Sequence, residues 1–163
     1  MMRYGRALCL ALALLLFAGT AAAASKPVIR ADKTYYDVNS GLYVLSGNVF
    51  IQVGSRVITA GQAKVNLGSL EVWGSGGITL TQGDIRLAAE NVHVLGPQNR
   101  ALIDGGVVFC RDGLNIRAER ADFDWKNKLA TFTGNVKVLQ QDSAWQAASV
   151  TYNVVTSEVA AAF

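Results

Sequence analysis

The sequence predicts an all-β fold in which antiparallel hairpins repeat every 29 residues. The first observation is a series of glycines at this spacing: Gly47, Gly76, Gly105 and Gly134. The second is a matching series of alanines: Ala31, Ala60, Ala89, Ala118 and Ala147. The third is the alternation of apolar and polar residues within each repeat, which is typical of a β-strand with one buried face. A fixed period of this length indicates one supersecondary unit that is repeated and stacked.

Each repeat begins with a strand whose first apolar position is held in turn by Ile29, Ile58, Leu87, Ile116 and Trp145, which gives four full repeats and half of a fifth. Turn-forming residues such as Gly68-Ser69 end this strand. A second strand follows, with apolar residues at alternate positions, and a second turn such as Gly54-Ser55 closes the hairpin. The alternation and the content of Val, Ile, Thr and Gly oppose helix formation in this part of the chain.

Two irregularities recur in the repeats. In the first strand the buried parity changes between Ala31 and Thr34 and at the equivalent positions of every unit, so we expect a bulge or corner there. In the second strand the repeated glycine falls on the inward face by parity, where the missing Cβ permits a sharp bend. Both features move a strand from one sheet to another. The predicted architecture is therefore two facing antiparallel sheets that share strands at corners, a β-jelly-roll or open β-sandwich.

The two ends of such an array are free sheet edges. We expect the N-terminal edge near residues 27–38 and the C-terminal edge at residues 145–156, where the fifth repeat stops without its second strand. A free edge can pair with another chain, so the pattern predicts assembly through these edges.

Residues 1–24 are predicted to be a cleavable signal peptide, and residues 25–163 a single domain. Arg3 and Arg6 precede an apolar stretch that is shorter than a membrane span, and small residues at 22–24 fit a cleavage site. Cys9 lies too early in that stretch to be the acylated cysteine of a lipoprotein, so we expect an exported protein that is not lipid-anchored. Without Arg3 and Arg6, 13 of the 15 basic residues remain against 12 acidic ones, and they are scattered, so no nucleic-acid partner is expected.

The residues that most often carry chemistry form no convincing constellation. His93 is the single histidine and shares an outward column with Asp122, so no metal site is predicted. Asp122 and Asp124 share a strand face, but solvent exposure is a better explanation than a catalytic pair. The segment 74–77 is glycine-rich yet precedes no helix, as a phosphate-binding loop would. Cys110 is the one cysteine beyond the leader, and its role stays open. We therefore predict no catalytic site and no cofactor.

The inward columns supply the candidate binding residues. Burying a methylene group contributes about 0.8 kcal/mol, so an inner face left open between splayed sheets would bind acyl chains. The alternative is an ordinary hydrophobic core, and these residues alone do not separate core from groove. Four arginines near strand ends, Arg30, Arg56, Arg86 and Arg117, are candidates for lipid phosphates at a groove mouth or for plain surface solubility. The candidate groove residues are Leu45, Val49, Ile51, Ile78, Leu80, Ile103, Val107, Phe109, Phe132, Val136 and Val138.

Several segments resemble the repeated strands of the organic-solvent-tolerance (OstA-like), or LptA, family. Residues 43–51 and 130–138 are similar to its strand with Gly-Asn-Val at the centre, and residues 59–63 and 117–121 to its strand with two alanines. The similarity covers about residues 28–160. The middle repeats depart from the family pattern, because Gly77 and Gly106 stand where asparagine is expected.

The resemblance implies a β-jelly roll in the periplasm that binds and transports lipopolysaccharide and is not an enzyme. Members stack head to tail, shield the acyl chains of lipid A, and link an inner-membrane complex to an outer-membrane translocon. For this chain it implies lipid A as ligand, a homo-oligomer formed by edge stacking, and the transport proteins of both membranes as partners. Two other hypotheses remain: a structural envelope protein without a lipid ligand, and, ranked last, an envelope enzyme acting on glycans.

Overall fold

The computed structural model describes residues 28–163, so the predicted signal peptide and Pro27 lie outside the described residues. The described chain forms one 13-stranded antiparallel sheet and a short 3-10 helix, η1 (Gly96–Gln98). The strands are β1 (Val28–Arg30), β2 (Lys33–Asp37), β3 (Leu42–Val53), β4 (Arg56–Asn66), β5 (Glu71–Ser75), β6 (Ile78–Gln82), β7 (Ile85–Ala89), β8 (Asn91–Leu95), β9 (Arg100–Arg111), β10 (Leu114–Asp124), β11 (Leu129–Gln140), β12 (Ser143–Asn153) and β13 (Val159–Ala162). The predicted all-β class and the repeated hairpins are confirmed.

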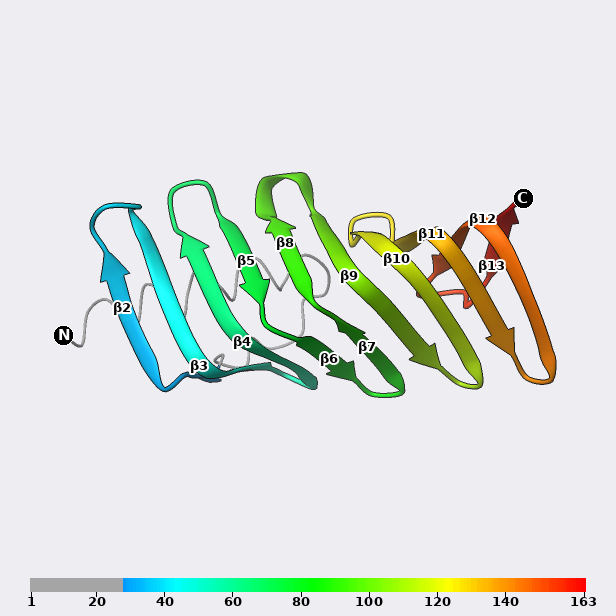
Figure 1. The fold of residues 1–163 in the computed structure, drawn as a ribbon, viewed down its shortest axis with the longest axis horizontal. Helices are drawn as coiled ribbons and strands as arrows, with labels where there is room; N and C mark the ends of the chain where they lie inside the picture. The colour runs from blue at the N-terminus through cyan, green and yellow to red at the C-terminus, as the bar shows by residue number, and fades with distance from the viewer. Residues whose placement is uncertain (1–27) are drawn as a thin grey trace.

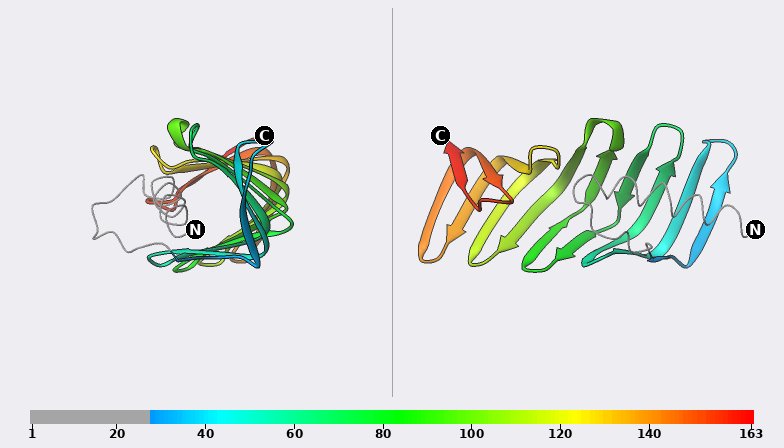
Figure 2. Two further views of the ribbon diagram at one scale, coloured as in Figure 1. Left: turned by 90° about the vertical axis from the view of Figure 1, so that its left-hand side faces the viewer. Right: turned by 180° about the vertical axis from the view of Figure 1, so that it is seen from behind.

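The sheet bends along its length into two arms. Strands stack side by side from β2 to β12, and their turns lie in an upper and a lower series (Figure 1). Viewed along the stack, the strands trace a C-shaped cross-section whose two arms end on the same side (Figure 2, left). The arms are two halves of one continuous sheet, because 12-residue strands such as β3 and β9 run through the bend. The two facing sheets that were expected to share strands at corners are thus the two arms of one continuous sheet.

Each bend is a bulge in which two residues of one strand oppose one residue of the next. Between β3 and β4, Ser46 pairs with Gln62 and the next pair is Val49 with Ala60, which leaves Gly47 and Asn48 opposite Gly61. Gly47 and Asn48 both have positive φ, 76° and 47°. Comparable register shifts occur between β9 and β10, β10 and β11, and β11 and β12. The predicted corners thus exist at the expected places.

The repeated glycines do not face the interior, and that part of the prediction is wrong. A Cβ added at Gly105 would overlap the Cβ of Glu90, and one added at Gly134 would lie 2.7 Å from the Cβ of Glu119. Glu90 and Glu119 are both exposed. The inward direction was inferred from the alternation of side chains along an extended strand. That alternation does not continue through a bulge whose residues have left-handed φ. The glycines are needed because the neighbouring strand passes so close.

The buried residues form two separate hydrophobic cores. The larger C-terminal core surrounds Phe132, Ile116 and Tyr152, while the smaller N-terminal core surrounds Leu45 and Val65. Between them the strands are shorter and interrupted, since β5 and β6 stop on either side of Gly76 and Gly77. The middle of the sheet is therefore packed less completely than its two ends.

The two ends of the sheet differ. At the N-terminal end, β1 and β2 pair only with β3 within the described chain, which matches the expected edge. At the C-terminal end, the expected edge at residues 145–156 needs correction. Strand β13 pairs with Ser149–Tyr152 and covers the upper half of β12. The fifth repeat does continue into a short second strand, and the uncovered part of β12 is its lower half.

Candidate functional site

The eleven candidate groove residues all lie on the inner side of the bent sheet, but in two packed groups. Leu45, Val49 and Ile51 belong to the N-terminal core. Ile103, Val107, Phe109, Phe132, Val136 and Val138 belong to the C-terminal core. Ile78 is buried at 4% exposure outside both cores, and Leu80 is half-buried. Most of the candidates are thus packed in the folded chain, and Leu80 alone among them is left partly accessible.

A continuous row of apolar side chains crosses the lower arm at right angles to its strands. Residues directly opposite one another in neighbouring strands lie on the same face of a sheet. Nine strands about 4.8 Å apart give this row a length of about 38 Å. We call it the apolar row; it consists of Ile29, Ile51, Ile58, Leu80, Leu87, Phe109, Ile116, Val138 and Trp145, each in register with the next.

The apolar row is partly accessible at its middle and at its two ends, Ile29 and Trp145, which are half-buried. Ile58, Leu80 and Leu87 are half-buried, whereas Ile51, Phe109, Ile116 and Val138 are 6% exposed or less. Ile58 and Leu87 were not among the candidates chosen from the sequence. Their signal was present, because both occupy the first apolar position of a repeat, but only second-strand columns were selected as groove residues. The register of the sheet joins the two kinds of column into one row.

The four candidate arginines do not gather at one mouth. Arg30, Arg86 and Arg117 alternate with inward residues and so lie on the outer face of the lower arm. The Arg30 guanidinium carbon lies 5.8 Å from the centre of the Phe50 ring. Arg56 alone has the inward parity, at the rim of the lower arm, and its Nε donates a hydrogen bond to Oε1 of Gln82 at 3.0 Å. Burial lowers the pKa of Arg56.

A second inward arginine at the same rim, Arg111, was missed by the sequence analysis. It follows Val107 and Phe109 at alternate positions of β9, and its side chain is only 20% exposed. Nothing in the sequence distinguishes this arginine from the others at strand ends. Its partners come from parts of the chain that lie far away in the sequence.

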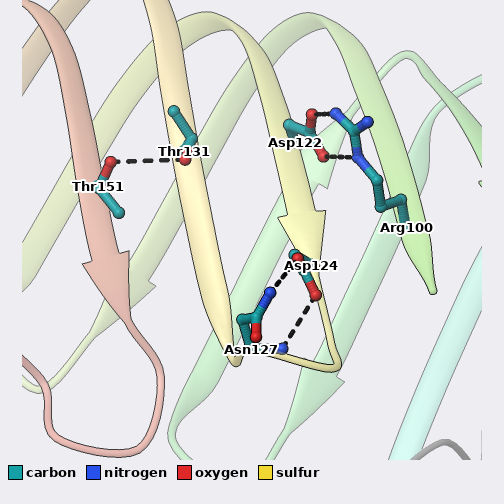
Figure 3. Close-up of polar contacts among 6 residues, drawn as sticks. All are labelled: Arg100, Asp122, Asp124, Asn127, Thr131 and Thr151. Atoms are coloured by element: carbon teal, nitrogen blue, oxygen red, sulfur yellow. Dashed lines mark hydrogen bonds and ion pairs between the residues drawn. The ribbon is translucent and has the colours of Figure 1, made fainter. Parts of the chain in front are cut away.

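Asp122 and Asp124, the carboxylates considered as a catalytic pair, both form local hydrogen bonds on the upper arm (Figure 3). Asp122 accepts a hydrogen bond from Nε of Arg100 at 3.1 Å and pairs with a second nitrogen of that guanidinium. Asp124 accepts bonds from the backbone and side-chain nitrogens of Asn127 at 2.9 and 2.7 Å, which lowers the pKa of Asp124. Each carboxylate therefore stabilises local structure: one an ion pair across strands, the other a turn.

His93 also has a local partner. Its Nε2 lies 2.7 Å from Oε2 of Glu71, and its ring stacks on Trp73 with centroids 4.9 Å apart. Within residues 28–163, no three His, Cys, Asp or Glu side chains gather closely enough to hold a metal ion. Cys110 is half-buried, and its sulfur accepts a hydrogen bond from Nδ2 of Asn115 at 3.0 Å. None of the helical segments in the described chain is long and apolar enough to cross a membrane.

Comparison with known proteins supports the resemblance noted in the sequence. Residues 115–157 match the family model described as LptA/(LptD N-terminal domain) LPS transport protein. A search among curated proteins gave no match. The fold is similar to the crystal structure of LptH, the LptA homologous periplasmic component of the lipopolysaccharide transport device from Pseudomonas aeruginosa, with a TM-score of 0.61 and 15% identity over 71% of this chain and 94% of that one. The family model thus matches 43 of the 163 residues, and the structural similarity shows that this chain and LptH share a fold.

Proposed function

We propose that this protein binds and transports lipopolysaccharide in the periplasm, holding acyl chains of lipid A against the middle of the apolar row. The observation that carries the proposal is the row itself. It is continuous across nine strands and consists of apolar side chains. Ile58, Leu80 and Leu87 keep part of their surface accessible between two closed cores. A family match to a lipopolysaccharide transport protein supports this choice of ligand.

The energetics favour an acyl ligand over a polar one. An acyl segment of about eight methylenes buried on this row would contribute about 6 kcal/mol at about 0.8 kcal/mol per methylene. A polar ligand would gain nothing from these three side chains and would lose its hydrogen bonds to water. The row is therefore suited to a hydrocarbon chain lying across the strands.

We further propose that protomers assemble head to tail and so bridge the two membranes, with transport proteins of the inner and outer membranes at the ends. Supporting this are the N-terminal edge at β1 and β2 and the uncovered lower half of β12 at the other end. Both present strand backbone for pairing with another chain. Since β13 covers the upper half of β12, docking there would use the lower arm first.

A second candidate function is that of a structural envelope protein without a lipid ligand. The observation in its favour is the close packing of both cores, where Leu45, Ile116 and Phe132 are all 0% exposed. In that case the middle of the row is a packing defect of the interrupted strands and no lipid would occupy it.

Photo-crosslinking in cells separates the two functions. A photoreactive residue placed at Leu80 points to the row, and the same residue placed at Thr81 points to the opposite face of β6, so the two sites are matched for their place along the strand. We expect lipopolysaccharide adducts at Leu80 and none at Thr81. Adducts at neither position, with both variants folded and exported, would favour the structural function. Equal adducts at both would mean that the lipid contact is not with the row.

A further inference from the structure

The arms of the bent sheet are joined across their open side by Arg111. This residue is the last of β9, at the rim of the lower arm. Its Nη1 donates hydrogen bonds to the carbonyl oxygen of Val154 at 2.6 Å and to the phenol oxygen of Tyr152 at 3.2 Å. Tyr152 is the second-last residue of β12, on the upper arm, and Val154 lies in the turn that follows. One guanidinium therefore joins the lower rim to the upper rim, where its partners lie 41 and 43 residues further along the sequence.

The guanidinium is held in place from the lower arm as well. Nε of Arg111 donates to Oδ2 of Asp84 at 2.9 Å, in the turn between β6 and β7. Asp84 raises the pKa of Arg111, and the guanidinium in turn lowers the pKa of Asp84. The planar guanidinium offers several donors in fixed directions, so one group can face Asp84 with Nε and the upper rim with Nη1. A lysine at this position would have a single donor atom for both.

Beneath this contact the two arms meet through aromatic rings. Phe109 of the lower arm lies 5.1 Å from the ring of Tyr152 and 5.6 Å from that of Phe132, both of the upper arm. Tyr152 is 1% exposed, so its hydroxyl needs a partner, and Arg111 is that partner. The rings fill the interior while the guanidinium covers it from the open side.

The same position in the other repeats carries no cation. Counting 29 residues at a time from Arg111 gives Val53, Gln82 and Gln140. The cross-mouth contact is thus a property of the third repeat and not of the repeated fold. Arg111 lies two residues beyond Phe109 on β9, and Phe109 is the register partner of Leu87 in the apolar row.

We propose that Arg111 is a latch that closes the open side of the sheet over the C-terminal third, so that acyl chains pass beyond Leu87 only when its bonds to the upper arm break. The role of the latch in acyl-chain passage along the apolar row rests on the proposed lipid-binding function. The mechanical part, closure of the two rims by Arg111, is independent of any ligand. The two parts are therefore measured separately.

The first measurement is the distance between the rims. Spin labels at Asp142 and Val155, both exposed, report the lower and upper rims by pulsed electron paramagnetic resonance, in a full-length background that carries Cys9→Ser and Cys110→Ser. We expect one narrow distance distribution in the parent protein and a broader, longer one in Arg111→Met. Arg100→Met is the control, since Arg100 lies on the same strand but pairs with Asp122 on the upper arm, away from the mouth. A distribution in folded Arg111→Met that matches the parent would overturn the latch.

Milder variants keep the test decisive if Arg111→Met does not fold. Tyr152→Phe retains the ring and removes only the phenol oxygen, so it leaves one of the two bonds to the upper arm. Arg111→Lys retains the charge and loses the second donor. Both are expected to broaden the distribution less than Arg111→Met, and unchanged distributions in both would overturn the latch.

The second measurement is the uptake of parinaric acid, a fluorescent fatty acid, by stopped flow. Arg111→Met removes both charge-assisted hydrogen bonds across the mouth, and is expected to speed uptake by about tenfold or more. If the rims separate but neither protein takes up the probe, the latch stands and the proposed lipid function fails. If the parent takes up the probe while Arg111→Met changes neither rim distance nor uptake rate, the lipid function stands and the latch fails.

Discussion

The bulge glycines provide a sharp test of how the sheet is bent. Gly105 and Gly106 are consecutive, both have left-handed φ, 84° and 82°, and both lie in the bulge of β9. A Cβ added at Gly105 would overlap the Cβ of Glu90 and lie 3.4 Å from its Cα, whereas one added at Gly106 would meet nothing within 4 Å. Two neighbouring glycines with similar backbones thus differ in the space around them, and their substitutions should differ in the free energy of unfolding.

The expected cost of Gly105→Val comes from two sources. A β-branched residue in the left-handed region costs about 1–2 kcal/mol. Forcing aside Glu90, which lies between β7 and β8, adds about 1–3 kcal/mol as overpacking. Together they lower the free energy of unfolding by about 2–5 kcal/mol. A marginally stable domain would lose a large part of its stability by this change.

Gly106→Asn is expected to be neutral or stabilising. The equivalent residues of the first and fourth repeats, Asn48 and Asn135, adopt φ of 47° and 46°, so asparagine fits this conformation. Asn48 Nδ2 donates to Oδ2 of Asp32 at 2.9 Å, and Asn135 bonds Glu119 in the same way. The equivalent acceptor for residue 106 is Glu90. Replacing glycine also restricts the unfolded chain, which contributes about 0.4–1 kcal/mol.

Urea unfolding followed by circular dichroism measures both effects. At an unchanged m-value, the midpoint should fall for Gly105→Val and stay equal or rise for Gly106→Asn. A Gly105→Val protein as stable as the parent would refute the account of the bend, and so would a Gly106→Asn protein that loses more stability than Gly105→Val.

Two further predictions concern the core and a turn. Phe132→Ala should lower the free energy of unfolding by about 3–5 kcal/mol, since Phe132 is 0% exposed. Leu80→Ala should lower it by less than about 2 kcal/mol, since Leu80 is half-buried. Equal losses of stability for the two variants in urea unfolding would contradict the two-core arrangement. Asp124 should titrate below its usual pKa, because Asn127 donates to it, so its contribution to stability is complete above the unfolded pKa and is lost as the pH falls through the lower folded pKa. Carboxyl titration by NMR checks this. Asn127→Ala keeps the backbone donor and removes the side-chain donor, so the pKa of Asp124 should rise part of the way toward its ordinary value; an unchanged pKa would show that the side-chain bond does not lower it.

Much of the fold could be predicted because the repeat makes every local signal recur. The columns that begin at Ile29 and Leu45 are strands with one buried face, and the parity change after Ala31 is a corner in the structure. The prediction that the repeated glycines face inward was wrong, because side-chain direction does not alternate regularly through a bulge with left-handed φ. Strand β13 was missed because residues 159–162 have too few branched or aromatic side chains to signal a strand.

The candidate site could be predicted only in part. The sequence identified which residues point inward, but the exposure of Leu80 beside buried Ile78 depends on how completely the middle strands pack. Ile58 and Leu87 join the site because register across the sheet aligns first and second strands of different repeats. Arg111 could not be found at all, since the contact with Val154 arises only when the whole sheet curves and brings its two rims together.

The central claim is that the middle of the apolar row is the surface that contacts lipid. The most direct measurement is the ratio of lipopolysaccharide adducts recovered from a photoreactive residue at Leu80 and at Thr81, with the adduct identified by mass spectrometry. The account predicts adducts carrying lipid A at Leu80 and a background level at Thr81. Background levels at both positions in folded, exported protein would contradict it.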